Sequence, residues 1–205
     1  MLTDADPHRV AREIVEQMRD DRTADHLDVA LPDDATVVTV GWPEVVGQAI
    51  ARRGDIRVLA IDADHQGSSF VQRLEHGDIE CELLPAEAAA LAAARADLVL
   101  VEAEAVDATR IVAPIGSAVL AAVAGVAGTP LWLVAGRGRR LPPALIDGMI
   151  ARIVDEDEPF DVEVEVVPTT SVTDVIGPDG RVSMSAAAVA AECDVAPELL
   201  RSSPI

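Results

Sequence analysis

The segment DLVLVEA at residues 97–103 is followed by PIGSAVLAAVAGVA at residues 114–127 and by PLWLVAG at residues 130–136. The first and third segments are short aliphatic runs of strand length, whereas the second is Ala-rich and of helical length. LVLV and LWLV are apolar on both faces, as central strands are when helices cover each side of a parallel sheet. The stretch therefore predicts a strand, a crossover helix and a second, parallel strand joined in the right-handed sense.

The same alternation continues on both sides of this unit. The further strand-like runs are TVVTVG at residues 36–41, IRVLAID at 56–62, IECELLP at 79–85 and DVEVEVVP at 161–168. The helix-like runs between them are PEVVGQAIARR at 43–53, GSSFVQRLEHG at 67–77, AEAAALAAARA at 86–96 and PPALIDGMIARI at 142–153. This alternation predicts an α/β fold, namely a Rossmann-like domain of three layers whose mostly parallel sheet has about five to six or more strands.

The N-terminal part departs from this pattern. Val10, Ile14 and Met18 lie four residues apart within residues 3–22, and charged residues fill the opposite face, so a short amphipathic N-terminal helix is predicted. The acidic stretch that runs on to Asp34 is interpreted as a connection. We therefore divide the chain into an N-terminal helix with its connection, residues 1–34, and a Rossmann-like domain, residues 35–205.

The C-terminal part contains a turn signal followed by an Ala-rich stretch. Pro178-Asp179-Gly180 is a typical turn sequence, and it predicts a loop or hairpin that closes the domain. SAAAVAAECDVAPELL at residues 185–200 then predicts a final helix.

The composition excludes several classes of protein. Half of the 205 residues are hydrophobic, which is enough to form a core and excludes an intrinsically disordered chain. The chain has 36 acidic residues against 16 basic ones, all of them arginine, and a net charge of −20. Such a surface repels nucleic acid and anionic membranes, except where basic residues cluster locally. Acidic chains without lysine are typical of halophilic, salt-accumulating organisms, in which salt screens the self-repulsion.

Neither a targeting segment nor a metal site is predicted. The N-terminal MLTDADPHRV is polar, and the longest apolar run, residues 111–126, is too short to span a bilayer, so we predict a cytoplasmic protein. Cys81 and Cys193 lie far apart without a CxxC partner or a histidine cluster, which argues against a zinc site and a disulfide. Both cysteines are expected to be small buried hydrophobic residues, and no metal or cofactor is predicted.

Two loops at the predicted strand ends contain candidate ligand-binding residues. In an open parallel sheet, ligands bind at the carboxyl ends of the strands, where helix N-termini present free N–H groups. Gly41 and Trp42 follow the first strand, and Trp42 is either a pocket wall or a packing residue. His65, Gly67 and Ser68 follow the second strand with the composition of an anion-binding nest, although a solvated loop with serine caps explains the same residues.

The central strand is followed by two carboxylates and a glycine-containing helix start. Glu102 and Glu104 are two residues apart, so on a strand their side chains face the same side. They are candidates for an acid and a base, or else an ordinary exposed pair. Gly116 and Ser117 begin the most apolar helix-like run.

Arg137, Arg139 and Arg140 form the only basic cluster in the sequence. They suit a phosphate or an acidic partner surface, and ion pairs within the protein are an equal alternative. The Gly-Arg-Gly step that begins at Gly136 lacks the rest of a dinucleotide fingerprint and follows the wrong strand. We therefore discard NAD binding, and the sequence also contains no G-x-S-x-G or Walker motif.

DLVLVEAEAV followed by IVAPIGSAVLAAVAGVAGTPLWLVAG resembles the signature of a known family. The family joins the alpha, beta and delta subunits of translation initiation factor 2B with methylthioribose-1-phosphate isomerase and ribose-1,5-bisphosphate isomerase. Its signature has an apolar strand, Gly-Ala-Asp, then Asn-Lys-Ile-Gly-Thr opening an Ala/Leu-rich helix, and Gly-x-Pro before a strand. TVVTVGWPEVVGQAIARR, IRVLAIDADHQG and FDVEVEVVPTTSVTDVIGPDGRV are similar to other family segments, so the resemblance covers residues 35–183.

The resemblance also implies where an isomerase site would lie, and the sequence departs from the family there. In the isomerases, a first-loop cysteine and the aspartate of Gly-Ala-Asp carry out the proton and hydride chemistry, while Arg, Asn and Lys hold the phosphate. Here the first loop contains Trp42 and no cysteine, and the aspartate position is Glu104. The positions of the Asn-Lys pair and of the second-loop arginine are Ala113, Pro114 and Asp64.

Together, these features predict a truncated, non-catalytic member of the family. It would act as a regulatory or binding protein, with a role in translation implied by the resemblance, and as a homodimer or with a related subunit. The alternative is an isomerase-like enzyme that uses Glu104 as general base on a small uncharged or cationic ligand. A third hypothesis places RNA or a nucleotide at Arg137, Arg139 and Arg140. The expected ligand-binding residues are Gly41, Trp42, His65, Gly67, Ser68, Glu104, Gly116 and Ser117.

Overall fold

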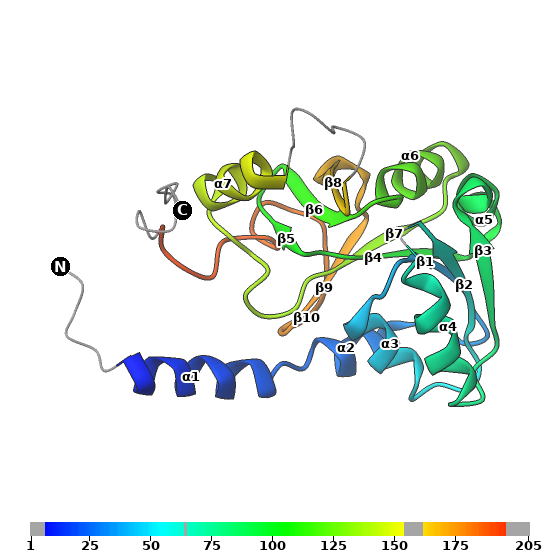
Figure 1. The fold of residues 1–205 in the computed structure, drawn as a ribbon, viewed down its shortest axis with the longest axis horizontal. Helices are drawn as coiled ribbons and strands as arrows, with labels where there is room; N and C mark the ends of the chain where they lie inside the picture. The colour runs from blue at the N-terminus through cyan, green and yellow to red at the C-terminus, as the bar shows by residue number, and fades with distance from the viewer. Residues whose placement is uncertain (1–6, 64, 154–161, 196–205) are drawn as a thin grey trace.

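A computed structural model describes residues 7–63, 65–153 and 162–195 (Figure 1). These residues form a seven-stranded sheet in the order β10-β9-β7-β4-β1-β2-β3. Its strands are β1 (Thr36–Val40), β2 (Arg57–Asp62), β3 (Cys81–Pro85), β4 (Leu98–Glu102), β7 (Leu131–Val134), β9 (Asp174–Gly177) and β10 (Gly180–Ser183). All neighbouring strands pair in parallel except β10, which pairs antiparallel with β9. The predicted α/β fold with a mostly parallel sheet is confirmed.

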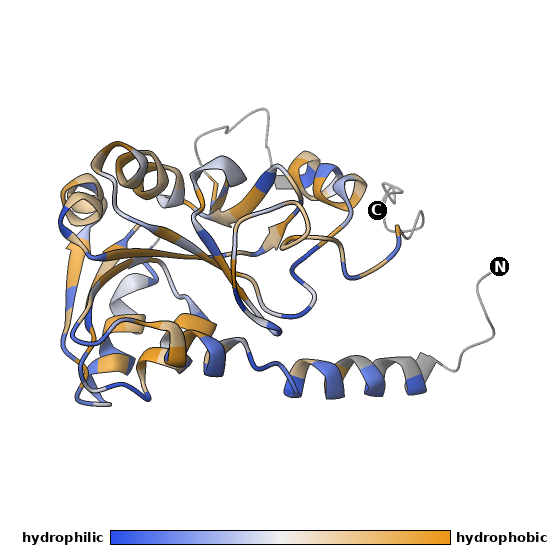
Figure 2. Ribbon diagram, turned by 180° about the vertical axis from the view of Figure 1, so that it is seen from behind, coloured by the Kyte–Doolittle hydropathy of each residue, from blue (hydrophilic) through white to orange (hydrophobic). Residues whose placement is uncertain are grey.

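Helices cover both faces of this sheet and complete the three layers (Figure 1). They are α2 (Thr23–Ala30), α3 (Glu44–Ile50), α4 (Gly67–Glu75), α5 (Ala89–Arg95) and α6 (Ser117–Ala127). A further helix, α7 (Pro143–Ile153), packs instead on a second sheet, where Ile146 is buried with Ala105 and Val112. Short 3₁₀ turns, η1 (Ala86–Ala88) and η2 (Thr169–Ser171), follow β3 and β8, the latter a strand of a second sheet. Figure 2 shows hydrophobic residues along the central strands and the helices packed against them.

The core of the seven-stranded sheet has two parts because successive side chains on a strand point to opposite faces. Val38 of β1 packs in the part that α5 and α6 cover, together with Leu120. Val37, its neighbour, packs in the part that α2, α3 and α4 cover, together with Phe70. The four residues of β7 are all buried, as expected for a central strand covered on both sides.

A second, three-stranded antiparallel sheet lies beside the first one. It consists of β5 (Ala105–Val106), β6 (Arg110–Pro114) and β8 (Val164–Pro168), in the order β5-β6-β8. The run at residues 161–168 was predicted as a strand of the parallel sheet, and this placement is wrong, because β8 pairs antiparallel with β6. The chain turns at Asp107, and β6 then provides a free edge for β8.

At the N-terminus, the structure has two helices where one was predicted. α1 (Pro7–Arg19) extends away from the sheet (Figure 1), and Val15 and Met18 on it are exposed. α2 lies within the predicted connection. Asp21 accepts a hydrogen bond from the backbone N–H of Thr23 at 2.9 Å where α2 begins, and Leu27 of α2 is fully buried in the core.

At the C-terminus, the predicted hairpin is confirmed and the predicted helix is wrong. β9 and β10 form the hairpin, and Gly180 has a φ of +116°, which only glycine adopts readily. Residues 185–195 contain turns and no helix, while residues 196–200 lie outside the described residues. Tertiary contacts outweigh the helix propensity of alanine here, because Val189 is buried in the core and Glu192 binds Arg140.

Two further expectations concern the cysteines and the membrane. Cys81 is half-buried and Cys193 is exposed, so the prediction that both are buried is wrong for Cys193. No helix within the described ranges is long and apolar enough to cross a bilayer.

Candidate functional site

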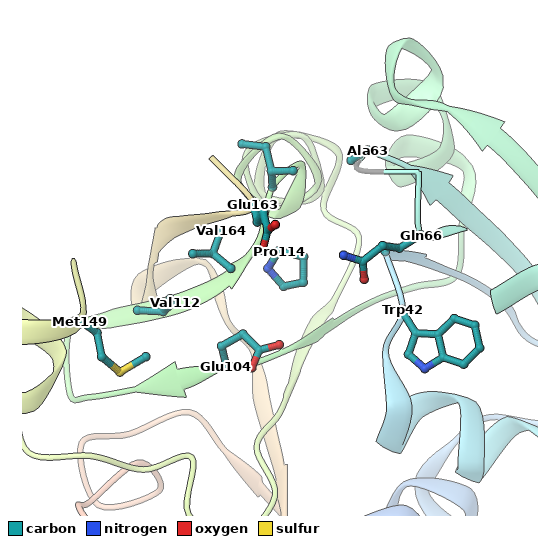
Figure 3. Close-up of a pocket in the computed structure, with 11 residues that line it drawn as sticks. Trp42, Ala63, Gln66, Glu104, Val112, Pro114, Met149, Glu163 and Val164 are labelled. Carbon is teal, nitrogen blue, oxygen red and sulfur yellow. The ribbon is translucent and has the colours of Figure 1, made fainter. Parts of the chain in front are cut away.

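A cavity of about 300 Å³ opens where the carboxyl ends of β1, β2 and β4 meet the second sheet (Figure 3). The loops after the parallel strands line it with Gly41, Trp42, Ala63, Gln66 and Glu104. The second sheet, its flanking segments and α7 line it with Val112, Pro114, Ile115, Met149, Glu163 and Val164. This strand-end cavity lies where ligands bind in open α/β sheets.

Three of the eight expected ligand-binding residues, Gly41, Trp42 and Glu104, line the strand-end cavity. The remaining five lie at neighbouring strand ends and are His65, Gly67, Ser68, Gly116 and Ser117. The ligand-binding role of all eight stays a prediction. The sequence analysis missed lining residues such as Met149 and Glu163, which lie far along the chain from the loops that follow β1, β2 and β4. No local sequence pattern indicates that these residues reach the cavity.

The backbone has a positive φ both at His65, just before α4, and at Gly116, just before α6. His65 has a φ of +55°, and the Ser68 hydroxyl donates to the His65 carbonyl oxygen at 3.4 Å. Gly116 has a φ of +96°, and a Cβ there would lie 3.2 Å from side-chain atoms of both Ala63 and Val40. Position 116 therefore requires glycine for two reasons: its φ is positive, and Ala63 in the loop after β2 leaves no room for a side chain.

Trp42 serves both of the roles that the sequence left open. Its ring packs edge-on against Phe70, with 6.1 Å between the ring centroids, and the guanidinium of Arg73 lies 5.8 Å from the Trp42 centroid. In Figure 3 the ring is turned away from Glu104. Trp42 thus packs against α4 while it also lines the cavity.

Glu102 and Glu104 have different surroundings, because β4 ends at Glu102 and the chain bends at Glu104. The Glu102 carboxylate accepts hydrogen bonds from the backbone N–H groups of Val45 and Val46 at 2.9 and 3.0 Å. Burial raises the pKa of Glu102 to about 7, although these two hydrogen bonds oppose the shift. Glu102 lines a separate cavity of about 260 Å³. The two carboxylates therefore do not form an acid–base pair in one cavity.

Glu104 is the carboxylate that faces the strand-end cavity, and it is half-exposed. Its carboxylate accepts a hydrogen bond from Nη1 of Arg139 at 2.6 Å. Arg139 does not itself line the strand-end cavity. The ion pair orients the Glu104 carboxylate.

The chain's own carboxylates occupy N–H groups at the starts of three helices near the strand ends. Glu102 accepts from α3, as described above. Asp62 accepts from the N–H of Gly67 at the start of α4, at 3.1 Å, and Glu165 accepts from the N–H of Ala118 in the first turn of α6, at 2.8 Å. Helix N-termini are where a phosphate group is ordinarily bound in this kind of fold. A phosphate would here compete with a carboxylate at each of these helices.

Two members of the arginine cluster form ion pairs within the protein. Arg139 binds Glu104, and Arg140 binds Glu192 at 2.5 Å and lies 3.7 Å from Asp179. The backbone N–H of Arg137 donates to Asp21 at 2.7 Å, while its exposed side chain makes no ion pair with any described residue. These contacts favour the internal ion-pair interpretation for two of the three arginines.

The comparison with protein families gives one match. Residues 8–151, more than half of the chain, match the model of the Initiation factor 2 subunit family. No curated protein matches the chain closely enough to count as a relative.

Several solved structures share the fold. Translation initiation factor eIF-2B of Pyrococcus horikoshii OT3 has a TM-score of 0.69 and 18% identity, covering 86% of this chain and 67% of its own. The tetrameric eIF2B-beta2-delta2 complex of C. thermophilum contains a chain with a TM-score of 0.65 and 21% identity, at coverages of 82% and 59%. 5-Methylthioribose 1-phosphate isomerase of P. horikoshii OT3 has a TM-score of 0.66 and 16% identity, at coverages of 88% and 61%. This chain thus spans between 59% and 67% of the length of these three proteins.

Proposed function

Because this chain belongs to the Initiation factor 2 subunit family, we propose that it is a non-catalytic member that acts by binding and regulation, with a role in translation. The observation that carries the proposal is the occupation of helix N-termini by the chain's own carboxylates. Glu102, Asp62 and Glu165 accept from N–H groups of α3, α4 and α6, and free N–H groups at helix N-termini are what typically binds a phosphate.

The charges around the strand-end cavity support the same proposal. Glu104 and Glu163 line it, and among the residues that the structure describes none that lines it is basic. Loss of a charged hydrogen bond costs about 1.5–3 kcal/mol, so two or three missing phosphate contacts weaken binding by roughly a thousandfold or more. The first loop also contains Trp42 where the isomerases have their cysteine. A dianionic sugar phosphate is therefore a poor ligand.

We further propose that the chain associates with a second copy of itself or with a related subunit in the cytoplasm. The fold is shared with a chain of the tetrameric eIF2B-beta2-delta2 complex of C. thermophilum, which is an assembly of related subunits. This likeness supports association through the α/β domain. Whether the partner is a second copy of the chain or a related subunit is for experiment to decide.

Two measurements at high salt test the proposed function. Incubation with methylthioribose-1-phosphate and with ribose-1,5-bisphosphate is expected to give no product and no increase in melting temperature. Sedimentation of the purified chain is expected to show a dimer. Turnover of either substrate would refute the non-catalytic assignment, and a monomer that also fails to bind related subunits would refute the proposed association.

The second candidate is an isomerase-like enzyme, favoured by the position of Glu104. Its carboxylate faces the strand-end cavity (Figure 3) and is held by Arg139, as a general base must be held. Turnover of an uncharged or cationic substrate that is lost in Glu104→Gln, while binding is retained, would establish this candidate in place of the first.

A further inference from the structure

We propose that two copies of this chain associate through the outer side of α5 and α6, with the two α5 helices antiparallel and Leu91 at the twofold axis. The inference rests on the proposed association, because it names the surface that the association uses. Figure 1 shows α5 and α6 side by side, and the two helices pack against each other. We call their solvent-exposed side the α5–α6 face; its apolar members are Ala90, Leu91, Ala94, Val119, Ala122 and Val126.

The α5–α6 face exposes several aliphatic side chains together. Val126 is 92% exposed, Leu91 54% and Val119 48%. A single exposed apolar residue is ordinary on a protein surface, whereas a contiguous apolar patch marks a place where another molecule binds. The packing of α5 against α6 brings the exposed residues of both helices into one patch.

The charge pattern of the sequence favours a second copy as the occupant of this patch. Residues 88–94 and 111–136 contain no charged side chain, although 25% of the chain is charged. At a net charge of −20, two copies repel each other wherever their acidic surfaces meet. On the α5–α6 face, two copies can approach without bringing carboxylates together.

The charges at the two ends of α5 make this face complementary to a copy of itself. Glu87 lies in the η1 turn that leads into α5, four residues before Leu91, and Arg95 ends α5, four residues after it. All three residues are exposed, as expected for positions four apart on one side of a helix. When two such segments pack antiparallel around a twofold axis at Leu91, Glu87 of each copy lies opposite Arg95 of the partner subunit.

Both charges are available for this contact. The side chains of Glu87 and Arg95 make no hydrogen bond or ion pair with any other residue that the structure describes. They are about 12 Å apart along the helix, at 1.5 Å per residue, which is too far for them to pair with each other. By contrast, Arg53, Arg110 and Arg140 each bind carboxylates of their own chain. The exposed, unpaired Arg95 therefore favours a carboxylate supplied by a second molecule.

A cysteine at the proposed axis tests the geometry. Leu91→Cys is made together with Cys193→Ser, because Cys193 is exposed, and the protein is oxidised at about 2 M NaCl, where charge repulsion is screened. Residues at a twofold axis face each other, so most of the protein is expected to form a disulfide-linked dimer. Val29→Cys, also with Cys193→Ser, is the matched control. Val29 is 85% exposed on α2, on the opposite face of the sheet, and should give no cross-linked dimer.

A charge at the same position tests how much the face contributes to affinity. Leu91→Glu places two carboxylates opposite each other at the axis. It should raise the dimer dissociation constant by roughly a hundredfold or more, because like charges that face each other across an interface repel strongly. Val29→Glu adds the same charge on the opposite face and should leave the constant unchanged. Sedimentation equilibrium measures the constants, and circular dichroism verifies that each variant is folded.

An exchange of the two end charges tests the antiparallel arrangement. Glu87→Arg and Arg95→Glu each place like charges opposite each other, and each should weaken the dimer several-fold at about 0.1 M NaCl. The double variant exchanges both charges and should restore the affinity of the wild type. Residues that act only within their own chain would not give this restoration.

The outcomes separate this inference from the proposed function. If the wild type is a dimer but Leu91→Cys does not cross-link and Leu91→Glu does not weaken it, the inference is overturned and the proposed association stands. Equal cross-linking of Leu91→Cys and Val29→Cys would show random collision and would also overturn it. A wild type that stays monomeric overturns the inference, and the proposed association then depends on related subunits alone. Turnover of a sugar phosphate would refute the non-catalytic assignment and leave this surface untouched.

Discussion

At the scale of single residues, the carboxylates of this chain are used as structural acceptors inside the protein. Glu102 shows this most clearly, because it is buried at the end of a central strand and accepts two backbone N–H groups of α3. Burial nevertheless disfavours its ionised form, and its pKa is raised to about 7. Two opposing effects therefore act on Glu102: the hydrogen bonds hold its carboxylate in place, and burial destabilises the negative charge.

Glu102 makes folding stability depend on pH in a defined direction. Its pKa rises from an ordinary value of 4.5 to about 7 on folding, so the folded state binds the proton more tightly than the unfolded state. The stabilisation is fully present below pH ~4.5 and is lost as the pH rises through ~7, with a magnitude on the order of 3 kcal/mol.

Urea unfolding at several pH values measures this effect. The free energy of unfolding of the wild type should fall between pH 4.5 and 7.5 by more than that of Glu102→Gln, which keeps an acceptor and loses the titration. Parallel pH curves for the two proteins would contradict the assignment.

At the scale of elements, one turn around a buried carboxylate, that of Asp107, determines how the second sheet forms. The Asp107 side chain is 2% exposed and accepts from the backbone N–H groups of Thr109 and Arg110, at 2.8 Å each. It also binds the Arg110 guanidinium at 2.6 Å. These contacts join β5 to β6, and β6 then pairs with β8. Without this turn, the strand-end cavity would lose one of its walls.

Asp107→Ala should destabilise the fold by about 2–4 kcal/mol, because it leaves two backbone N–H groups and a partly buried guanidinium without their buried acceptor. Asp147→Ala is the control. Asp147 is the other carboxylate on Arg110, at 2.5 Å, but its side chain is 65% exposed, so its loss should cost about 0.5 kcal/mol or less. Chemical unfolding measures both free energies, and similar effects for the two variants would argue against the role of the Asp107 turn.

At the scale of the whole molecule, a net charge of −20 surrounds an ordinary aliphatic core. Many acidic side chains are engaged in ion pairs or caps, but the 16 arginines cannot balance 36 acids. The remaining charges repel one another in the compact state, and this repulsion extends only over the Debye length.

Salt should therefore stabilise this protein. The melting temperature is expected to rise by several degrees between 0.1 and 2 M NaCl, since the Debye length falls from about 10 Å at 0.1 M to below 3 Å. A variant that neutralises exposed acids outside the cavity, such as Asp78→Asn with Glu87→Gln, has less charge repulsion to screen. Its melting temperature should therefore rise less than that of the wild type over the same range of NaCl. A melting temperature that does not change with salt would contradict the repulsion argument.

The sequence by itself determined the main sheet and the region of the candidate site. Apolar runs such as residues 98–101 and 131–134 are buried on both faces, and a pattern of that kind depends only on the segment that carries it. The rule that ligands bind at strand carboxyl ends then pointed to Gly41, Trp42 and Glu104, which line the strand-end cavity.

Only the tertiary structure decided which distant segments meet. The antiparallel partner of β8, the approach of Glu163 and Met149 to the cavity, and the separation of Glu102 from Glu104 all depend on residues far apart in the chain. A local pattern reports whether a side chain is buried, whereas hydrogen bonds and ion pairs depend on which groups are brought within about 3 Å of each other. For the carboxylates of this protein, that proximity decides whether a group caps a helix, as Glu102 does, or lines the strand-end cavity, as Glu104 does.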